Sequence, residues 1–248
     1  MTTIAVIGAT GQIGRLVVAE ALNDGVTVRA QSRDAGRAHR VLPQGAEVVA
    51  ADPTDAEALR PVLEGVDAVV LTHGADVDGR GGKTFYEVVR AVLEVLPERA
   101  HVSLMTAMRT SEHPARYEFI AWKRRAERLL RASGRPYLIV RPGWFGYEGP
   151  QDHAIDLRQG DLVTGQPGVS KQHVAQVLLA GAHAAAVPGT TVEFFSKVGA
   201  PDDDVPALLT AMEADDAAHS GRGSQDSTEV PLAEEPEEVR RDLAAHGA

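Results

Sequence analysis

Short apolar runs rich in β-branched residues alternate with amphipathic stretches along most of the chain. The apolar runs are typical of buried parallel strands. They fall at Thr3–Ile7, Val26–Gln31, Glu47–Ala50, Ala68–Leu71, His101–Met105 and Tyr137–Val140. Helical spacing of apolar residues predicts helices over Arg15–Leu22, Ala56–Leu63, Thr84–Leu96 and Arg116–Arg131. This alternation predicts an α/β fold, a doubly wound parallel sheet with right-handed crossovers.

The pattern changes after Val140. Residues 147–160 are irregular and polar, and a short strand at 162–164, a helix over Lys171–Ala186 and a final strand at Thr191–Phe195 are expected to follow. We therefore expect one domain over residues 1–200, in which residues 141–200 cover the carboxyl ends of the sheet and shape a substrate pocket. Residues 201–248 form a tail, with expected helices at Val205–Met212 and Pro236–Gly247 and a polar linker over 214–229.

Charge separates this tail from the rest of the chain. The 248 residues carry a net charge of −10, and the tail alone holds thirteen Asp and Glu against three Arg. The body is therefore neutral, which argues against nucleic acid or an anionic membrane as partner. The absence of cysteine excludes disulfides and thiolate metal sites. Because a strand begins at Thr3, no room is left for a signal peptide, and a cytoplasmic location is expected.

Three glycines punctuate the passage from the first strand to the first helix. Gly8, Gly11 and Gly14 are spaced three residues apart, with Thr10 where the G-x-G-x-x-G pattern has its middle glycine. Glycine permits the tight turn, the approach of a phosphate to the backbone and close packing of helix on strand. Free N–H groups of the helix start, near Gln12 and Ile13, would bind a dinucleotide phosphate in a Rossmann-like fold.

The end of the second strand indicates which dinucleotide is bound. Ser32 and Arg33 stand where an NAD-binding protein usually has an acid, and Arg37 follows one helical turn later. A guanidinium suits the 2′-phosphate of NADPH, so NADPH is expected over NADH. Asp34 is expected to cap the following helix. After the third strand, the residues alone place Asp52 in a turn, with Thr54 capping the next helix.

These motifs, together with Arg141-Pro-Gly-Trp-Phe, resemble the atypical short-chain dehydrogenases/reductases of the NAD(P)-binding, NmrA-like group. The resemblance covers about residues 1–200 and implies a nicotinamide cofactor. It implies that an aspartate at Asp52 contacts adenine, and that the loop after the sixth strand passes the nicotinamide with backbone N–H donors. Further cofactor contacts are expected at Pro53, Thr72, His73, Gly74, Lys123, Pro142, Gly143, Trp144 and Phe145.

The resemblance breaks at the catalytic tyrosine. Standard members use Tyr-x-x-x-Lys, in which the lysine holds the nicotinamide ribose and lowers the pKa of the tyrosine. Lys123 matches the lysine, but Phe119 occupies the tyrosine position, and Tyr117 would point away on a helix. The serine position is changed as well, and Thr106 is the nearest hydroxyl. We expect Lys123, a water that it positions, or a histidine such as His73 to supply the proton.

The leading hypothesis is an NADPH-dependent reductase that transfers hydride to a small planar substrate: a quinone, a flavin or an aromatic ketone. Trp144 and Phe145 would form an aromatic wall for it, although Phe145 is equally suited to core packing. The alternatives are a non-enzymatic NADP(H) sensor that acts on a protein partner, and an isomerase or epimerase with tightly bound cofactor. No metal is expected. A homodimer, or a protein partner bound through the acidic tail, remains open.

Overall fold

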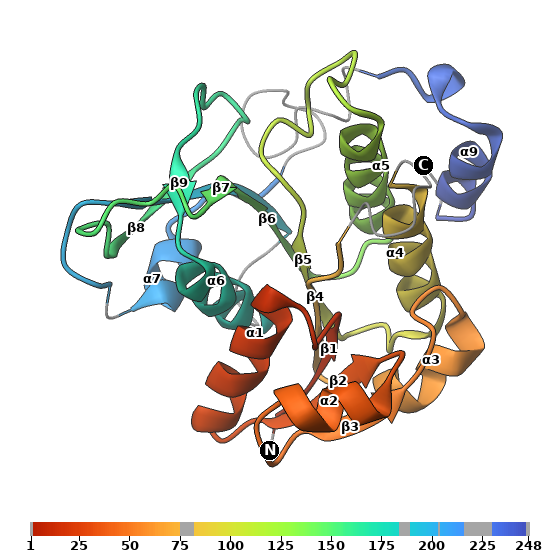
Figure 1. Ribbon diagram of the computed structural model, residues 1–248. Coiled ribbons are helices and arrows are strands. Elements are labelled where there is room, and N and C mark those ends of the chain that lie inside the picture. The colour runs from red at the N-terminus through yellow and green to blue at the C-terminus, as the bar shows by residue number, and fades with distance from the viewer. Residues whose placement is uncertain (1, 75–81, 184–188, 203, 216–229, 247–248) are drawn as a thin grey trace.

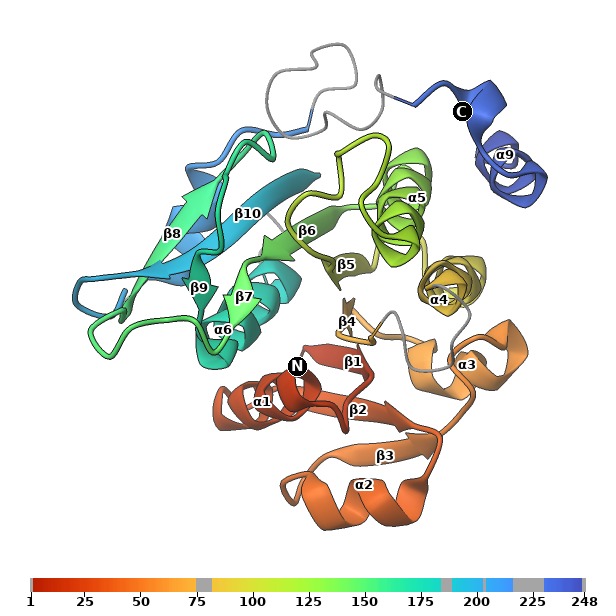
Figure 2. The same cartoon turned by 45° about the horizontal axis from the view of Figure 1, so that its top comes forward.

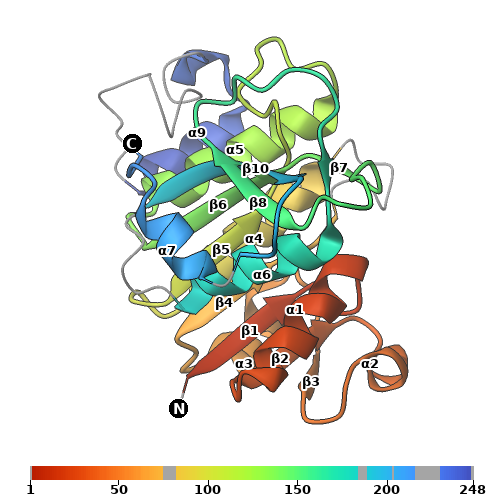
Figure 3. The same cartoon turned by 90° about the vertical axis from the view of Figure 1, so that its left-hand side faces the viewer.

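The computed structural model describes residues 2–74, 82–183, 189–202, 204–215 and 230–246, and its centre is an eight-stranded sheet (Figure 1). The strand order is β3-β2-β1-β4-β5-β6-β10-β8. All neighbours are parallel except β8, which runs antiparallel to β10 at the edge (Figure 3). The predicted α/β fold with a doubly wound parallel sheet is confirmed.

The strands are β1 (Thr3–Ile7), β2 (Thr27–Ser32), β3 (Glu47–Ala50), β4 (Ala68–Leu71), β5 (His101–Met105), β6 (Tyr137–Pro142), β7 (Trp144–Phe145), β8 (Ala154–Arg158), β9 (Gly168–Val169) and β10 (Thr190–Lys197). The helices are α1 (Gln12–Asn23), α2 (Ala35–Val41), α3 (Ala56–Leu63), α4 (Lys83–Val95), α5 (Glu118–Ala132), α6 (Lys171–His183), α7 (Val205–Thr210), a short 3₁₀ turn η1 (Leu232–Glu234) and α9 (Glu237–Ala244).

Two apolar layers hold the helices on the sheet. Helices α1 and α6 pack together on one face, and α3, α4 and α5 cover the other (Figures 1 and 2). The central strands are buried on both faces, as their continuous apolar runs require. No helix in the described ranges has both the length and the apolarity to cross a bilayer.

The region after β6 departs from the sequence expectations. The segment expected to be irregular contains β8, which pairs with β10 from Ala154 to Arg158. The strand expected at residues 162–164 does not form, so that prediction was wrong. Instead, Trp144–Phe145 pairs with Gly168–Val169 as a separate two-stranded sheet. The expected end of the sixth helix, after His183, and most of the expected linker lie outside the described residues.

The described end of the acidic tail, residues 230–246, packs on α4 and α5 of its own chain, and we call it the C-terminal clasp (Figure 2). The Glu235 carboxylate is fully buried and pairs with three arginines of α5. The distances are 2.7 Å to Arg124 Nη1, 2.9 Å to Arg125 Nε and 3.2 Å to Arg128 Nη1. Part of the acidity of the tail therefore neutralises one face of α5.

Further contacts extend the clasp along α4. Val239 and Leu243 are completely buried in the apolar layer that includes both helices. Lys83 Nζ lies 2.7 Å from Glu238, and the Tyr86 hydroxyl donates to Asp242 at 2.8 Å. The clasp thus ties the outer faces of α4 and α5 together.

We expect Glu235→Ala to lower the free energy of unfolding by about 3–5 kcal/mol, because removing one partner leaves buried arginines without their counter-charge. Urea unfolding followed by circular dichroism measures this change. The control is Glu237→Ala, which removes an exposed carboxylate two residues away and should stay within about 0.5 kcal/mol. Equal small losses in both variants would contradict the role of Glu235.

Candidate functional site

The turn between β1 and α1 has glycines at positions where a side chain would collide with neighbouring backbone. Gly8 has a φ of +80°, and a Cβ there would lie 3.0 Å from the backbone nitrogen of His73. A Cβ on Gly14 would overlap the carbonyl oxygen of Gly8. No side chain caps α1 at Gly11, so the helix start presents N–H groups without a side-chain acceptor. This arrangement favours an anion such as a pyrophosphate.

A cavity of about 260 Å³ opens beside this turn, and we call it the first cavity. Its lining includes many of the predicted cofactor residues: Gly8, Thr10, Gly11, Ser32, Arg33, Arg37, Pro53, Thr72, His73 and Gly74. It also includes Gln31, Thr84 and Val88, which the sequence analysis did not single out. Gln31 is recognisable only in the fold, since its side chain crosses from β2 to accept from the Gly8 N–H at 3.1 Å.

The arginine pair stands at the end of β2, as expected. Arg33 and Arg37 are exposed and line the first cavity. The Asp34 carboxylate accepts a hydrogen bond from the Arg37 N–H at 2.9 Å and caps α2. It is therefore engaged in the helix cap. The predicted cap is thereby confirmed, and the side chains directed at the cavity from this turn are cationic. A phosphate group fits these residues.

Asp52 forms a turn with its own neighbours. Its Oδ1 accepts from the backbone N–H of Thr54 at 2.9 Å and from the Thr54 hydroxyl at 2.7 Å. These hydrogen bonds hold the pKa of Asp52 below its ordinary value. The cap of α3 is Asp55 and not Thr54, which corrects the sequence expectation. Of this segment, Pro53 lines the first cavity.

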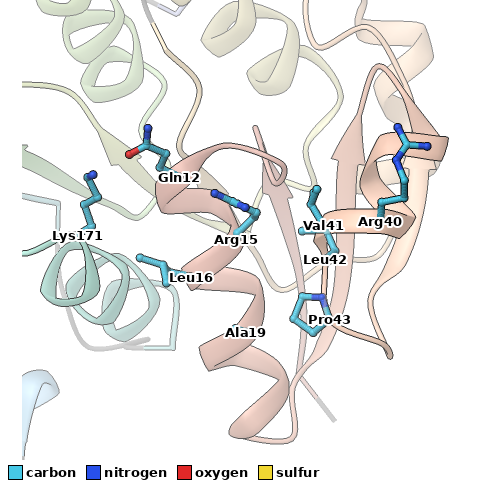
Figure 4. Close-up of a pocket in the computed structure, with 9 residues that line it drawn as sticks. All are labelled: Gln12, Arg15, Leu16, Ala19, Arg40, Val41, Leu42, Pro43 and Lys171. Carbon is cyan, nitrogen blue, oxygen red and sulfur yellow. The ribbon is translucent and has the colours of Figure 1, made fainter.

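Several other predicted cofactor residues lie away from the first cavity. Ile13 is part of the apolar core, and Gln12 lines a groove of about 690 Å³ between α1, α2 and α6 (Figure 4). Figure 4 shows Gln12 and Arg15 on α1 and Lys171 on α6 at this groove. For Gln12 and Ile13, only the backbone at the start of α1 is placed to meet a phosphate.

His73 is held in a neutral state against α4. Its Nε2 lies 3.1 Å from the Phe85 carbonyl oxygen, and the two rings stack with centroids 4.4 Å apart. Burial lowers the pKa of His73 to about 4, and the Lys123 charge acts in the same direction. Nδ1 is buried without a partner among the described residues. A neutral imidazole with one nitrogen to spare suits a hydrogen bond to a cofactor, so the residues fit that group.

Lys123 projects from α5 to the carboxyl ends of the strands. Its Nζ donates to the Thr106 carbonyl oxygen at 2.8 Å and lies 5.4 Å from the centre of the Phe85 ring. Burial lowers the pKa of Lys123 to about 8, although the Glu127 carboxylate opposes the shift. Phe85 stacks on His73, so one residue separates this ammonium from the lining of the first cavity.

A second cavity, of about 330 Å³, is lined by residues that include Ala107, which directly follows Thr106 in the chain. Its lining combines apolar and aromatic side chains with charged ones: Ala107, Met108, Arg109, Glu112, Arg116, Tyr117, Phe119, Ile120, Pro142, Gly143, Trp144, Gly165 and Gln166. Tyr117 precedes α5 instead of lying on it, and its ring stacks on Phe119. Lys123 lines neither cavity itself, but its ammonium contacts Thr106, the residue before Ala107 of the second cavity.

The loop after β6 lines part of the second cavity, and its first two N–H groups donate to backbone carbonyl oxygens of the protein. Gly143 donates to the Phe194 carbonyl oxygen at 3.0 Å, and Trp144 donates to that of Pro167 at 2.9 Å. These two groups are consequently not available to the nicotinamide, contrary to what the resemblance implied. Trp144 is 46% exposed and lines the second cavity; Phe145 is 40% exposed, which overturns its expected alternative of core packing.

A buried network of hydrogen bonds and ion pairs around Glu127 holds Thr106, whose carbonyl oxygen binds Lys123. The Thr106 hydroxyl donates to Glu127 Oε1 at 2.5 Å, so it faces Glu127 and not the lining of a cavity. Arg141 of β6 donates to Glu127 through Nε at 3.1 Å and through Nη2 at 2.5 Å. Arg141 Nη1 continues to Asp161 at 3.5 Å and lies 3.9 Å from Glu193.

The doubly wound sheet, the glycine turn and the arginines at the end of β2 define a dinucleotide-binding protein. A family model described as NAD(P)H-binding matches residues 8–185, and the chain belongs to that family. The predicted resemblance to atypical short-chain dehydrogenases/reductases is confirmed at this level.

Two curated relatives and a solved structure illustrate the family. Protein TIC 62, chloroplastic, of Pisum sativum is 29% identical over 212 residues, which cover 71% of this chain and 39% of that protein. Quinone oxidoreductase 2 of Escherichia coli (strain K12) is 31% identical over 147 residues, covering 57% and 49%. The chain thus spans less than half the length of these relatives. The crystal structure of the oxidoreductase ylbE from Lactococcus lactis shares the fold, with a TM-score of 0.67, 16% identity, and coverage of 87% of this chain and 100% of that one.

The crowding of acids around Arg141 gives a testable dependence on pH. Burial raises the pKa of Glu193 to about 7, with Asp161 and Glu127 adding to the shift and Arg141 opposing it. Between its ordinary pKa of 4.5 and about 7, the folded chain keeps a proton that the unfolded chain releases. Stability therefore falls as pH rises through this window.

We expect Glu193→Gln to raise the free energy of unfolding at pH 8 by about 2–3 kcal/mol and to change it little near pH 5. Urea titrations at the two pH values measure the difference. Glu98→Gln, which alters an exposed carboxylate, serves as the control and should give the same small change at both. A Glu193→Gln effect that does not vary with pH would refute the assignment.

Proposed function

We propose that the chain is an NADPH-dependent reductase that transfers hydride to a planar acceptor, a quinone, flavin or aromatic ketone. The observation that carries this proposal is the position of Lys123 between residues next to each cavity. Its ammonium donates to Thr106, directly before Ala107 of the second cavity, and lies over Phe85. Phe85 in turn stacks on His73 of the first cavity. A dinucleotide site beside an aromatic-lined pocket is the arrangement that hydride transfer needs. The name of the relative quinone oxidoreductase 2 supports the same acceptor class.

The cofactor would be held from both ends of the first cavity. The glycine turn and the start of α1 would meet the pyrophosphate, and Arg33 and Arg37 would meet the 2′-phosphate of NADPH. Thr72, His73 and Gly74 would follow its central part. A bound reduced nicotinamide supplies a hydride to the acceptor.

The remaining requirement is a proton for the acceptor, on the oxygen of a quinone or ketone or on a ring nitrogen of a flavin, and Lys123 would provide it. With a pKa of about 8, its ammonium is protonated at neutral pH and still acidic enough to act as a general acid. The acceptor gains one hydride and one proton, and Lys123 recovers its proton from solvent. His73 has a pKa of about 4, so it is neutral at pH 7 and would act as a hydrogen-bonding partner and not as the acid.

We expect Lys123→Arg to lower kcat by about 100-fold or more, because arginine keeps the positive charge but does not release its proton. In the wild type, kcat/KM for the acceptor should be level below about pH 8 and fall above it, as Lys123 loses its proton. NADPH oxidation with a panel of quinones, flavins and aromatic ketones measures both, and Lys171→Arg on α6 is the control.

An unchanged kcat in Lys123→Arg would place the proton donor elsewhere. Absence of turnover with every acceptor, in protein shown to bind NADPH, would overturn the reductase proposal and favour the sensor instead.

The choice of cofactor is tested at Arg33. Arg33→Asp should weaken NADPH binding by about 10- to 100-fold, which corresponds to the loss of a charge-assisted hydrogen bond, and should leave NADH binding nearly unchanged. Fluorescence titration with each nucleotide measures the two dissociation constants. Arg40→Asp is a matched control on the same helix region, since Arg40 lines the groove of Figure 4 and not the first cavity. Equal losses for both nucleotides would show that Arg33 does not read the phosphate.

A further inference from the structure

We propose that the acceptor of the second cavity is an anion, a planar ring that carries a phosphate, sulfonate or carboxylate group held by Arg109 and Arg116. That the ligand is planar is inferred from the proposed reductase function. That it is an anion is inferred from the residues of the second cavity alone. The pocket is divided accordingly: apolar side chains such as Met108, Ile120 and Trp144 would contact the ring, and the two guanidinium groups supply positive charge.

Arg109 is placed in the cavity at a conformational cost. Its φ is 65°, in the left-handed region that is unfavourable for a residue with a side chain. Asp161 maintains this conformation, since its carboxylate accepts from the Arg109 N–H at 2.6 Å and from the Ser111 N–H at 2.9 Å. Asp161 itself has a φ of 51°. Glycine would adopt the same backbone without strain, so the side chain at 109 has a use of its own.

The guanidinium of Arg109 makes two weak contacts within the protein, which a ligand can replace. Nη2 donates to the Gly165 carbonyl oxygen at 3.4 Å, and Nε lies 3.5 Å from Glu112. The Glu112 side chain is 45% exposed, and an ion pair of that kind contributes little. An anionic ligand with better geometry can therefore displace Glu112 from Arg109.

Arg116 belongs to an aromatic stack on the other side of the cavity. Its guanidinium carbon lies 5.4 Å from the centre of the Tyr117 ring, and that ring stacks on Phe119 with centroids 5.6 Å apart and planes 10° apart. The stack restricts the arginine, which reduces the entropy lost when it binds an anion. A planar ligand can extend the same stack.

The balance of charge also favours an anion. Arg109 and Arg116 outweigh Glu112 in the lining, and the Lys123 ammonium donates to the carbonyl oxygen of Thr106, the residue before Ala107. The whole chain carries −10, so its long-range field repels anions. The positive charge of the second cavity is therefore confined to its lining. It would attract an anionic ligand only through direct contacts with the arginines.

Matched pairs of acceptors test the proposal. Riboflavin and FMN share one ring and differ by a phosphate, and naphthoquinone and naphthoquinone sulfonate differ by a sulfonate. We expect the wild type to have the higher kcat/KM for the anionic member of at least one pair. Arg109→Gln with Arg116→Gln should lower the anionic-to-neutral ratio by about tenfold, mainly through KM, since neither side chain supplies the proton. Added salt should reduce the wild-type ratio.

Arg60→Gln is the control, because Arg60 is an exposed arginine of α3 that lines neither cavity. A loss confined to FMN identifies a phosphate, and a loss confined to the naphthoquinone pair identifies a sulfonate or carboxylate; both support the anion site. A ratio near one in the wild type, or a ratio unchanged in the double variant, would overturn it and leave the reductase proposal intact.

Binding separates this proposal from the proposed function. If no acceptor is turned over, flavin fluorescence is titrated with NADP⁺ saturating the first cavity. Tighter binding of FMN than of riboflavin, lost in the double variant, would then establish the anion site without reductase activity. Equal binding of both flavins would refute it.

Discussion

The site depends on one buried ion pair, between Glu127 of α5 and Arg141 of β6. Both side chains are almost completely excluded from solvent, and such a pair is stable only when further hydrogen bonds satisfy its remaining oxygens and N–H groups. Thr106 and Thr110 supply them on the Glu127 side. Because Thr106 also receives the Lys123 ammonium through its carbonyl oxygen, the pair that joins helix to sheet also determines the position of Lys123, the proposed general acid.

The same network reaches the second cavity through Asp161. Arg141 approaches Asp161, and Asp161 holds the backbone of Arg109 and Ser111. A helix, a central strand and an irregular loop are thereby connected by charge-assisted hydrogen bonds. Burial raises the pKa of Glu193, and the charge of Arg141, 3.9 Å away, opposes this shift only in part. The position of Lys123, the loop that carries Arg109 and the strand that carries Glu193 therefore depend on a common set of charges.

Features encoded within a short segment were predictable from the sequence. The strands, the glycine turn and the Asp34 cap are examples, since each depends on residues a few positions apart. Edge structure was not, because β8 is specified by its partner β10 and shows no apolar run of its own. The contact between Glu127 and Arg141 joins two different elements, and that between Glu235 and α5 joins residues more than a hundred positions apart; the burial of both is visible only in the fold. The strained backbone of Arg109 likewise has no local signature, because it is imposed by Asp161.

Phenylalanine at position 119 restricts the chemistry that the site can support. Among the proposed acceptors, an aromatic ketone is reduced to an alkoxide, which is far more basic than a phenolate and needs a strong hydrogen-bond donor such as the missing tyrosine. Reduction of a quinone places charge on an oxygen whose conjugate acid resembles a phenol, with a pKa near 10. As the proposed acid, a Lys123 ammonium with a pKa of about 8 would protonate that oxygen downhill. The ring of Phe119 instead adds to the apolar wall of the second cavity. The same substitution thus removes an acid that a delocalised acceptor does not need and supplies a surface on which its flat ring can stack.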